Sequence, residues 1–309
     1  MDAIQVVLLW LGACIILLGV CGNLLVLLGA YKERTLRKVP YMFVLNLCVC
    51  HLIALLVPYM VFVLALSKGE FQLSSVVCKC QAYMAYTLTM ETMATMILIS
   101  INRYIRVLQP VRYPLIFTER RTVFLIIASW LVSALGNIFP LIGYGRYGLN
   151  NPVDYMCALQ VSESVIQITV GGACIIIAVI IIITCYVRVF CTIRALNRRV
   201  RSLNRRTLND HRRKFSVVPR ESRSEEIQIA ITLFLLVVIF GICWSPTVVS
   251  VVINAITGQP TSHIAGVIRV NALVLETVAD PVVYAIRNKM FRQVLRKTLT
   301  CKKNSSQTN

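Results

Sequence analysis

The sequence predicts one bundle of seven membrane-spanning helices. The chain has 309 residues, of which 57% are hydrophobic and only 15% are charged, and its mean hydropathy is +0.73. Its apolar residues stand in long blocks, and about 20 such residues cross a hydrocarbon core of roughly 30 Å. Lipid offers no hydrogen-bond partners to the backbone, so long, continuously apolar blocks form helices rather than the alternating strands of a barrel. These observations exclude a soluble globular fold.

Seven blocks meet this length, and we expect them to form a single domain over residues 1–309. The first block is too long for a signal-peptide core, and Lys32-Glu33-Arg34 follows it, so we expect it to be retained as a span. Residues 1–5 then precede the bundle of residues 6–286, and residues 287–309 form a short amphipathic helix with a tail. The expected spans are 6–31, 40–66, 77–105, 123–144, 165–189, 227–256 and 265–286.

The basic residues predict the orientation of the bundle. Nearly all Lys and Arg lie in the connections 32–38, 106–121 and 192–226 and after Arg287. Basic loops stay cytoplasmic, so we expect the amino terminus outside and the carboxyl terminus inside, in the plasma membrane. The formal net charge is +19. Because the basic residues flank spans, we expect them to contact anionic lipid headgroups and not nucleic acid.

The 12 cysteines fall into two groups. Most lie within spans, where cysteine is typically a small apolar packing residue. At the outer face, we expect one disulfide between Cys78 and Cys157; Cys80 is the competing partner, and the residues alone do not choose between them. In the tail, Cys301 is a candidate for palmitoylation, with an unmodified thiol as the alternative.

Three motifs lie near the ends of apolar blocks: Asn102-Arg103-Tyr104, Trp244-Ser245-Pro246 and Asp280-Pro281-Val282-Val283-Tyr284. Pro246 removes a backbone hydrogen bond inside its helix and bends it close to Trp244. A bent helix can pivot, which indicates a switch; an inert kink with a packed tryptophan is the structural alternative.

With these motifs in this order, the chain resembles the rhodopsin-like (class A) G protein-coupled receptors over nearly its whole length. The asparagine of Asn102-Arg103-Tyr104 and the aspartate Asp280 also occur around the melatonin-like branch. Each span carries a mark of the family: Gly22-Asn23, Leu47, Cys78 with the Asn102 motif, Trp130, Tyr186, Phe240 with the Trp244 motif, and the Asp280 motif.

The resemblance implies coupling to a heterotrimeric G protein. In its resting state the family pairs the arginine of the third helix with an acid of the sixth, here Arg103 and Glu226; two separately solvated charges are the alternative. Asn102 replaces the usual acid beside Arg103, so we expect a less restrained arginine and basal activity. The expected coupling and switch residues are Asn102, Arg103, Tyr104, Tyr186, Glu226, Phe240, Trp244, Pro246, Asp280, Pro281 and Tyr284.

The spans also carry ionisable residues near the middle of the bilayer. His51 stands where the family has an aspartate, and Glu276 and Asp280 stand where asparagines are commoner. Such groups are costly in lipid and interact with one another. We therefore expect a polar core of Asn23, His51, Thr92, Glu276 and Asp280, with Glu91 as a further candidate.

In relatives with the usual aspartate, this region binds sodium. We expect the carboxylates of Glu276 and Asp280 to outweigh the cost of burial, so that a protonated His51 replaces the ion. A neutral His51, with the acids sharing protons or recruiting an ion, and a purely structural network are the alternatives.

The resemblance places a ligand pocket among the outer halves of the third, fifth, sixth and seventh helices, with Trp244 as its floor. Ala85 stands where amine receptors carry an aspartate, and Val274 where opsins carry the retinal-binding lysine, so we expect neither ligand. Arg269 is a candidate partner for a ligand carboxylate, or a snorkelling interfacial arginine. The expected pocket residues are Ala85, Tyr86, Thr89, Cys174, Thr247, Val251, Arg269 and Val270.

The short amino-terminal segment argues against a large protein hormone, which leaves a small or lipid-like ligand, or none. A transport protein or proton pathway built on His51, Glu276 and Asp280 is the alternative function, although no internal repeat supports it. No metal-ligand spacing or nucleophile-base set appears in the sequence, so we expect no enzyme, no cofactor and no metal site.

Overall fold

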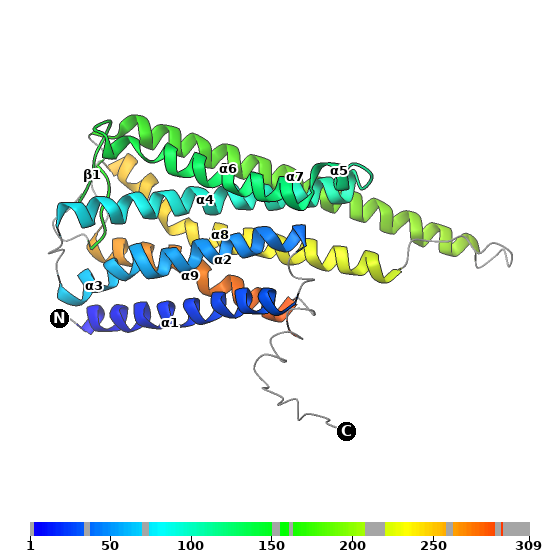
Figure 1. Cartoon of the computed structure of the whole chain (residues 1–309), viewed down its shortest axis with the longest axis horizontal. Coiled ribbons are helices and arrows are strands. Elements are labelled where there is room, and N and C mark those ends of the chain that lie inside the picture. The colour runs from blue at the N-terminus through cyan, green and yellow to red at the C-terminus, as the bar shows by residue number, and fades with distance from the viewer. Residues whose placement is uncertain are drawn as a thin grey trace, which may run out of the picture.

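The computed structural model forms a bundle of seven long helical segments, as the sequence predicts (Figure 1). It describes residues 3–33, 38–69, 74–149, 155–160, 163–207, 220–257, 262–287 and 292. The short helix expected after the seventh span lies outside these residues. The long segments are α1 (Ala3–Lys32), α2 (Val39–Ala54) continued through η2 (Leu55–Tyr59) into α3 (Met60–Lys68), α4 (Ser75–Leu108), α6 (Glu119–Gly136), α7 (Val165–Thr207), α8 (Arg220–Thr257) and α9 (His263–Arg287).

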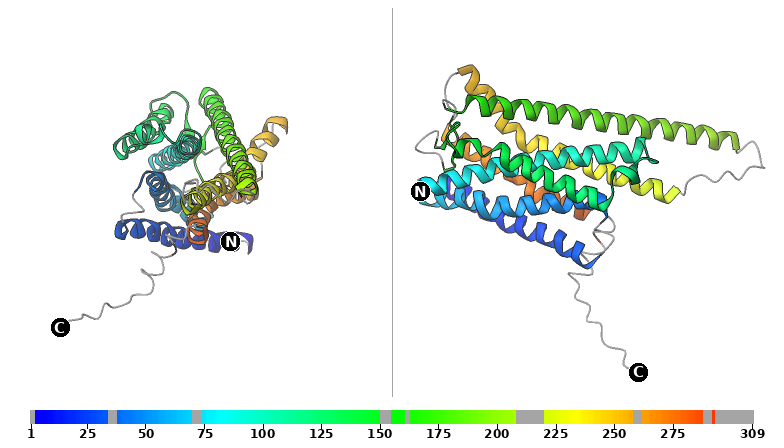
Figure 2. Two further views of the ribbon diagram at one scale, coloured as in Figure 1. Left: turned by 90° about the vertical axis from the view of Figure 1, so that its right-hand side faces the viewer. Right: turned by 45° about the horizontal axis from the view of Figure 1, so that its top comes forward.

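The remaining elements lie in the connections. A two-stranded antiparallel hairpin pairs Tyr147 with Leu159. The hairpin lies at the same end of the bundle as the start of α1, while α7 and α8 project beyond the opposite end (Figures 1 and 2). These short elements are α5 (Tyr113–Ile116), η3 (Phe139–Leu141), β1 (Tyr147–Gly148) and β2 (Ala158–Leu159).

The outer surface of the bundle is apolar, as a lipid-facing surface must be. Six of the described helical segments are long and apolar enough to cross a membrane. The seventh, α9, is less apolar because one side carries Asn271, Glu276 and Asp280, all buried within the bundle. Outward-facing side chains such as Phe124 and Ile242 are about two-thirds exposed or more. The polar groups of α9 thus face its neighbours and not lipid.

The second span is interrupted by a π-helical turn. Pro58 lies inside this turn and has no N–H to donate, so the regular hydrogen-bond pattern cannot continue through it. Gln81 of α4 donates from Nε2 to the Pro58 carbonyl at 3.1 Å, and the Tyr59 hydroxyl donates to Asn271 Oδ1 at 2.7 Å. The irregular turn is therefore fastened to α4 and α9.

Three span boundaries differ from those expected. The fourth helix ends at Gly136 and not near residue 144, because the chain turns at Asn137 and Pro140 lies in the next short helix. The fifth helix continues to Thr207 and the sixth begins at Arg220, so much of the expected connection 192–226 is helical. Arginine and leucine favour helix, but hydropathy detects only the part within the membrane.

A buried carboxylate joins α2, α4 and α6. The side chain of Glu91 is fully buried, and its Oε1 receives hydrogen bonds from Asn46, Thr95 and Ser129 at 2.8, 3.2 and 2.9 Å. Ser133 Oγ lies 3.3 Å from Oε2. Glu91 therefore does not join the expected polar core, because adjacent helical residues point about 100° apart and Thr92 takes the direction of the core.

Replacing Glu91 by leucine should destabilise the protein. The donors of Asn46, Ser129 and Ser133 would lose this acceptor, at a cost of about 1–3 kcal/mol for a group left without any partner. Asn46 and Ser129 keep a second acceptor, at Thr95 and at the Ile126 carbonyl. Glu91→Gln keeps one acceptor oxygen and should be mild. Thermal unfolding of the detergent-solubilised protein, together with surface expression, measures the difference. Equal stability of the leucine variant and the unmodified chain would contradict this account of the cluster.

Candidate functional site

A largely apolar cavity lies among the second, third, sixth and seventh spans. The fifth-span helix α7 contributes no described lining residue, in contrast to the expectation from the sequence. The irregular turn η2 does contribute, through Pro58 and Tyr59. The lining residues are His51, Ala54, Pro58, Tyr59, Ala85, Leu88, Thr89, Thr92, Met156, Trp244, Val270, Leu273, Val274, Glu276 and Thr277.

The expected pocket residues separate into two groups. Ala85, Thr89 and Val270 line the cavity with Trp244, whereas Thr247 and Arg269 are not among its lining residues. Cys174 lies exposed on α7 and cannot contact the cavity. The side chain of Val251 lies outside the described part of the chain.

Tyr86 also points away from the cavity, toward the outer hairpin. Its ring stacks on that of Tyr147 with centroids 5.9 Å apart. Its hydroxyl accepts a hydrogen bond from the Leu159 amide at 3.3 Å. Tyr86 therefore supports the loop that covers the cavity.

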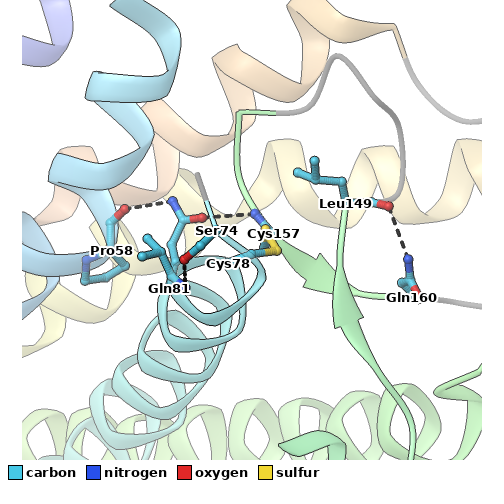
Figure 3. Close-up of a disulfide and its surroundings, with 8 residues drawn as sticks. Pro58, Ser74, Cys78, Gln81, Leu149, Cys157 and Gln160 are labelled. Atoms are coloured by element: carbon cyan, nitrogen blue, oxygen red, sulfur yellow. Dashed lines mark hydrogen bonds between the residues drawn. A yellow bond between two sulfur atoms is a disulfide. The ribbon is translucent and has the colours of Figure 1, made fainter. Parts of the chain in front are cut away.

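A disulfide holds this loop against the bundle, as predicted. Cys78 of α4 is bonded to Cys157, and Cys80 is an exposed free thiol. Gln81 Oε1 accepts a hydrogen bond from the Cys157 amide at 3.1 Å, beside the bond that Gln81 makes to Pro58 (Figure 3). The neighbouring Met156 lines the cavity, so the fastened loop forms part of its cover.

The floor of the cavity is the polar core. His51 Nε2 lies 3.9 Å from Asp280 Oδ2, and both side chains are almost completely buried. Glu276 and Thr92 line the same space. Asn23 lies to one side, where its Nδ2 donates to the carbonyl of Thr277 at 2.8 Å and ties α1 to α9. The outer pocket and the polar core thus form one continuous cavity.

The core acids differ in their position relative to the cavity. Asp280 faces His51, but neither Asp280 oxygen accepts a hydrogen bond from the described residues. Oε2 of Glu276 accepts none either, and Glu276 is the acid that lines the cavity. Glu276 is 9% exposed. An unpaired buried carboxylate is costly, so this arrangement suits a positively charged or hydrogen-bond-donating occupant.

Arg103 lies buried at the far end of α4, with 1% of its surface exposed. Its Nη2 donates to Asn102 Oδ1 at 3.0 Å, and Asn102 Nδ2 donates to the Tyr113 hydroxyl at 3.2 Å. Asn102 therefore still contacts the arginine, through an uncharged amide oxygen that accepts a hydrogen bond from the guanidinium. The expected pairing of Arg103 with Glu226 stays a prediction, because the Glu226 side chain lies outside the described residues.

Aromatic contacts connect the cavity with the half of the bundle that lies away from the hairpin. The Trp244 ring stacks on Phe240 with centroids 5.3 Å apart, and Pro246 lies inside the same helix. Phe240, Tyr186 and Tyr284 belong to one buried apolar cluster. Tyr104 is only partly buried beside Arg103.

A close approach fastens the Asp280 motif to α1. A Cβ at Gly22 would lie 3.0 Å from Cβ of Pro281, so only glycine fits without a shift. The conformation of α9 at Pro281 therefore depends on the first helix.

Residues 22–284 match the family described as 7 transmembrane receptor (rhodopsin family). The chain belongs to this family. It is therefore a multi-pass membrane protein of a receptor family and not an enzyme. Melanopsin-B of Xenopus laevis is 26% identical over 97% of the chain and 56% of its own length, and melatonin receptor type 1A of Mus musculus is 23% identical over 92% and 77%.

The fold of this rhodopsin-family chain agrees with a solved structure. The crystal structure of squid rhodopsin covers 100% of the chain and 89% of its own chain, with a TM-score of 0.81 and 22% sequence identity. At this identity the likeness shows the fold alone. The chain spans about half the length of the melanopsins of Xenopus laevis and Gadus morhua.

Several lining residues were not singled out from the sequence. Ala54 and Pro58 follow His51 on one side of the second span, at helical spacings of three and four residues. This spacing could have predicted that both residues line the cavity. Nothing in the sequence indicated the π-helical turn that carries Pro58 into the lining. Met156 enters the lining only through the folding of the loop.

Removal of either disulfide cysteine should abolish surface expression or ligand response. A bond that closes a loop of this length typically contributes about 2–4 kcal/mol, so Cys78→Ser and Cys157→Ser should each lose it. Cys80→Ser is the matched control and should behave as the unmodified chain does. Surface labelling of the three variants provides the comparison. A silent Cys78→Ser together with a damaging Cys80→Ser would reverse the pairing.

Proposed function

We propose that this chain is a plasma-membrane receptor that couples to heterotrimeric G proteins. The ligand is a small or lipid-like molecule bound in the cavity, or the receptor signals without one. The observation that carries the proposal is the cavity whose lining residue Trp244 stacks on Phe240, which belongs to the apolar cluster of the inner half. Family membership supports it, since the rhodopsin family is a family of receptors.

The switch in this proposal is the sixth-span helix α8. Pro246 weakens the helix one half-turn from Trp244, so a ligand that displaces the indole changes the bend. Phe240 belongs to the same buried apolar cluster as Met93, Met96 and Tyr186. The transducer surface consists of Arg103, Tyr186 and Tyr284 with the neighbouring basic connections.

The proposed orientation has the hairpin end outside and the projecting ends of α7 and α8 in the cytoplasm. The basic residues gather in the connections at this second end, which supports the assignment. It also places Cys78 and Cys157 in the oxidising compartment that disulfides require. No observation favours the alternative of a transport protein.

Coupling should depend on Arg103 and Glu226. Arg103→Ala should suppress signalling at equal surface expression, because the arginine contacts the transducer. Glu226→Ala removes the proposed lock and should raise ligand-free signalling. Cyclic-nucleotide and calcium responses in cells that express each variant test both effects. An unchanged basal signal in both variants would refute the mechanism.

The polar core should make the receptor indifferent to sodium. The distance of 3.9 Å between His51 and Asp280 suits an internal imidazolium in place of the ion. His51→Asp adds a third acid, so signalling should become sodium-sensitive or fail through charge repulsion. Responses are compared in sodium and in a bulky organic cation at matched ionic strength. Strong sodium dependence of the unmodified chain would disprove the internal cation.

A further inference from the structure

The two acids of the polar core differ in what they face. A single imidazolium neutralises at most one carboxylate, and His51 lies against Asp280. Oε2 of Glu276 and both oxygens of Asp280 accept no hydrogen bond from the described residues, but only Glu276 lines the cavity. Inside a membrane, a buried carboxyl group without a hydrogen-bond partner destabilises the protein. The occupant of the cavity is therefore expected to supply the missing donor.

The other lining residues restrict what that occupant can be. Apart from the core, the threonine hydroxyls and the Tyr59 hydroxyl, which donates to Asn271, they are apolar, with the Trp244 indole among them. A metal ion needs several oxygen ligands, and no group of three or more His, Cys, Asp or Glu side chains in the described ranges is placed to hold one. An apolar body with a single cationic donor fits this lining.

The basic residue considered for a ligand carboxylate does not face the cavity. Arg269 is not among the described lining residues. The position that serves as the amine anchor in amine receptors is Ala85, which lines the cavity without a charge. The acid that faces a ligand here is Glu276 of α9, and His51 lines the same cavity.

We propose that the cavity binds a small organic cation, an ammonium group on a compact apolar body, and that the Glu276 carboxylate binds the charged nitrogen. This inference rests on the proposed function of the cavity as the ligand site. The apolar body lies between Ala85, Trp244 and Val270 under the cover formed by Met156. The ligand completes the hydrogen bonding of Glu276, which Asp280 and His51 leave unsatisfied.

The test compares two probes of the same shape and different charge. Phenethylamine is an ammonium at pH 7, and 2-phenylethanol is its neutral counterpart. The full chain is solubilised in detergent, and its midpoint of thermal unfolding is measured with each probe. Near-saturating phenethylamine should raise the midpoint by about 3 °C or more and 2-phenylethanol by less. This readout needs no G protein, so a failure of coupling and a failure of cation binding are distinguishable.

Three variants assign the effect to Glu276. Glu276→Gln should weaken phenethylamine by about 10- to 100-fold and leave 2-phenylethanol unchanged, because a charged hydrogen bond is lost. The variant removes an unsatisfied carboxylate, so the free protein should unfold at the wild-type temperature or above. Glu91→Gln makes the same change in a buried acid outside the cavity and should retain the preference for the amine. Ala85→Phe fills the cavity and should abolish the effect of both probes.

Three results would overturn the proposal. The first is equal stabilisation by amine and alcohol, and the second is no stabilisation by either probe at millimolar concentration. The third is a stabilisation by sodium that depends on Glu276 and replaces that by phenethylamine, which would make the occupant an inorganic cation.

Discussion

The cost of an unpaired polar group inside a membrane determines where the polar side chains of this protein lie. Lipid satisfies no donor or acceptor, so each such group must find a partner within the bundle. Asn23 bridges α1 and α9, Tyr59 bonds to Asn271, and Glu91 joins three helices. The apolar outer surface and the polar side of α9 follow from the same constraint. The helices can be apolar toward lipid because their polar residues face one another.

Two buried glutamates illustrate how this constraint separates structure from function. Glu91 accepts hydrogen bonds from donors on α2, α4 and α6, so its carboxyl oxygens hold these helices together. Glu276 lies on a cavity and keeps an oxygen without a partner in the described part of the chain. An acid whose oxygens accept hydrogen bonds from the protein stabilises the fold and gains little from a ligand. An acid with an oxygen that accepts none favours the binding of a donor in the cavity. The difference lies in the surroundings and not in residue type.

The sequence was sufficient for the bundle, since length and hydropathy depend on the membrane and not on detailed packing. It also identified the disulfide and the approximate position of the polar core. Adjacent residues of a helix face different neighbours. The hydropathy of Glu91 and Thr92 therefore does not indicate which of the two lies on the side of His51. The sequence also did not predict the π-helical turn at Pro58 or the continuation of α7 to Thr207. Both depend on backbone hydrogen bonds, which composition does not reveal.

The placement of Glu276 connects the proposed cation site to the end of α9 that follows Pro281. Glu276 and Asp280 lie four residues apart on one side of α9, about 6 Å along its axis. Pro281 follows directly and packs against Gly22, and Tyr284 lies one turn further, buried in the inner cluster. A cation bound at Glu276 lowers the repulsion between the two acids and thereby changes the balance of the His51–Asp280 contact. Since this contact lies beside the proline, a change in it would act on the segment of α9 that carries Tyr284, one of the residues of the proposed transducer surface.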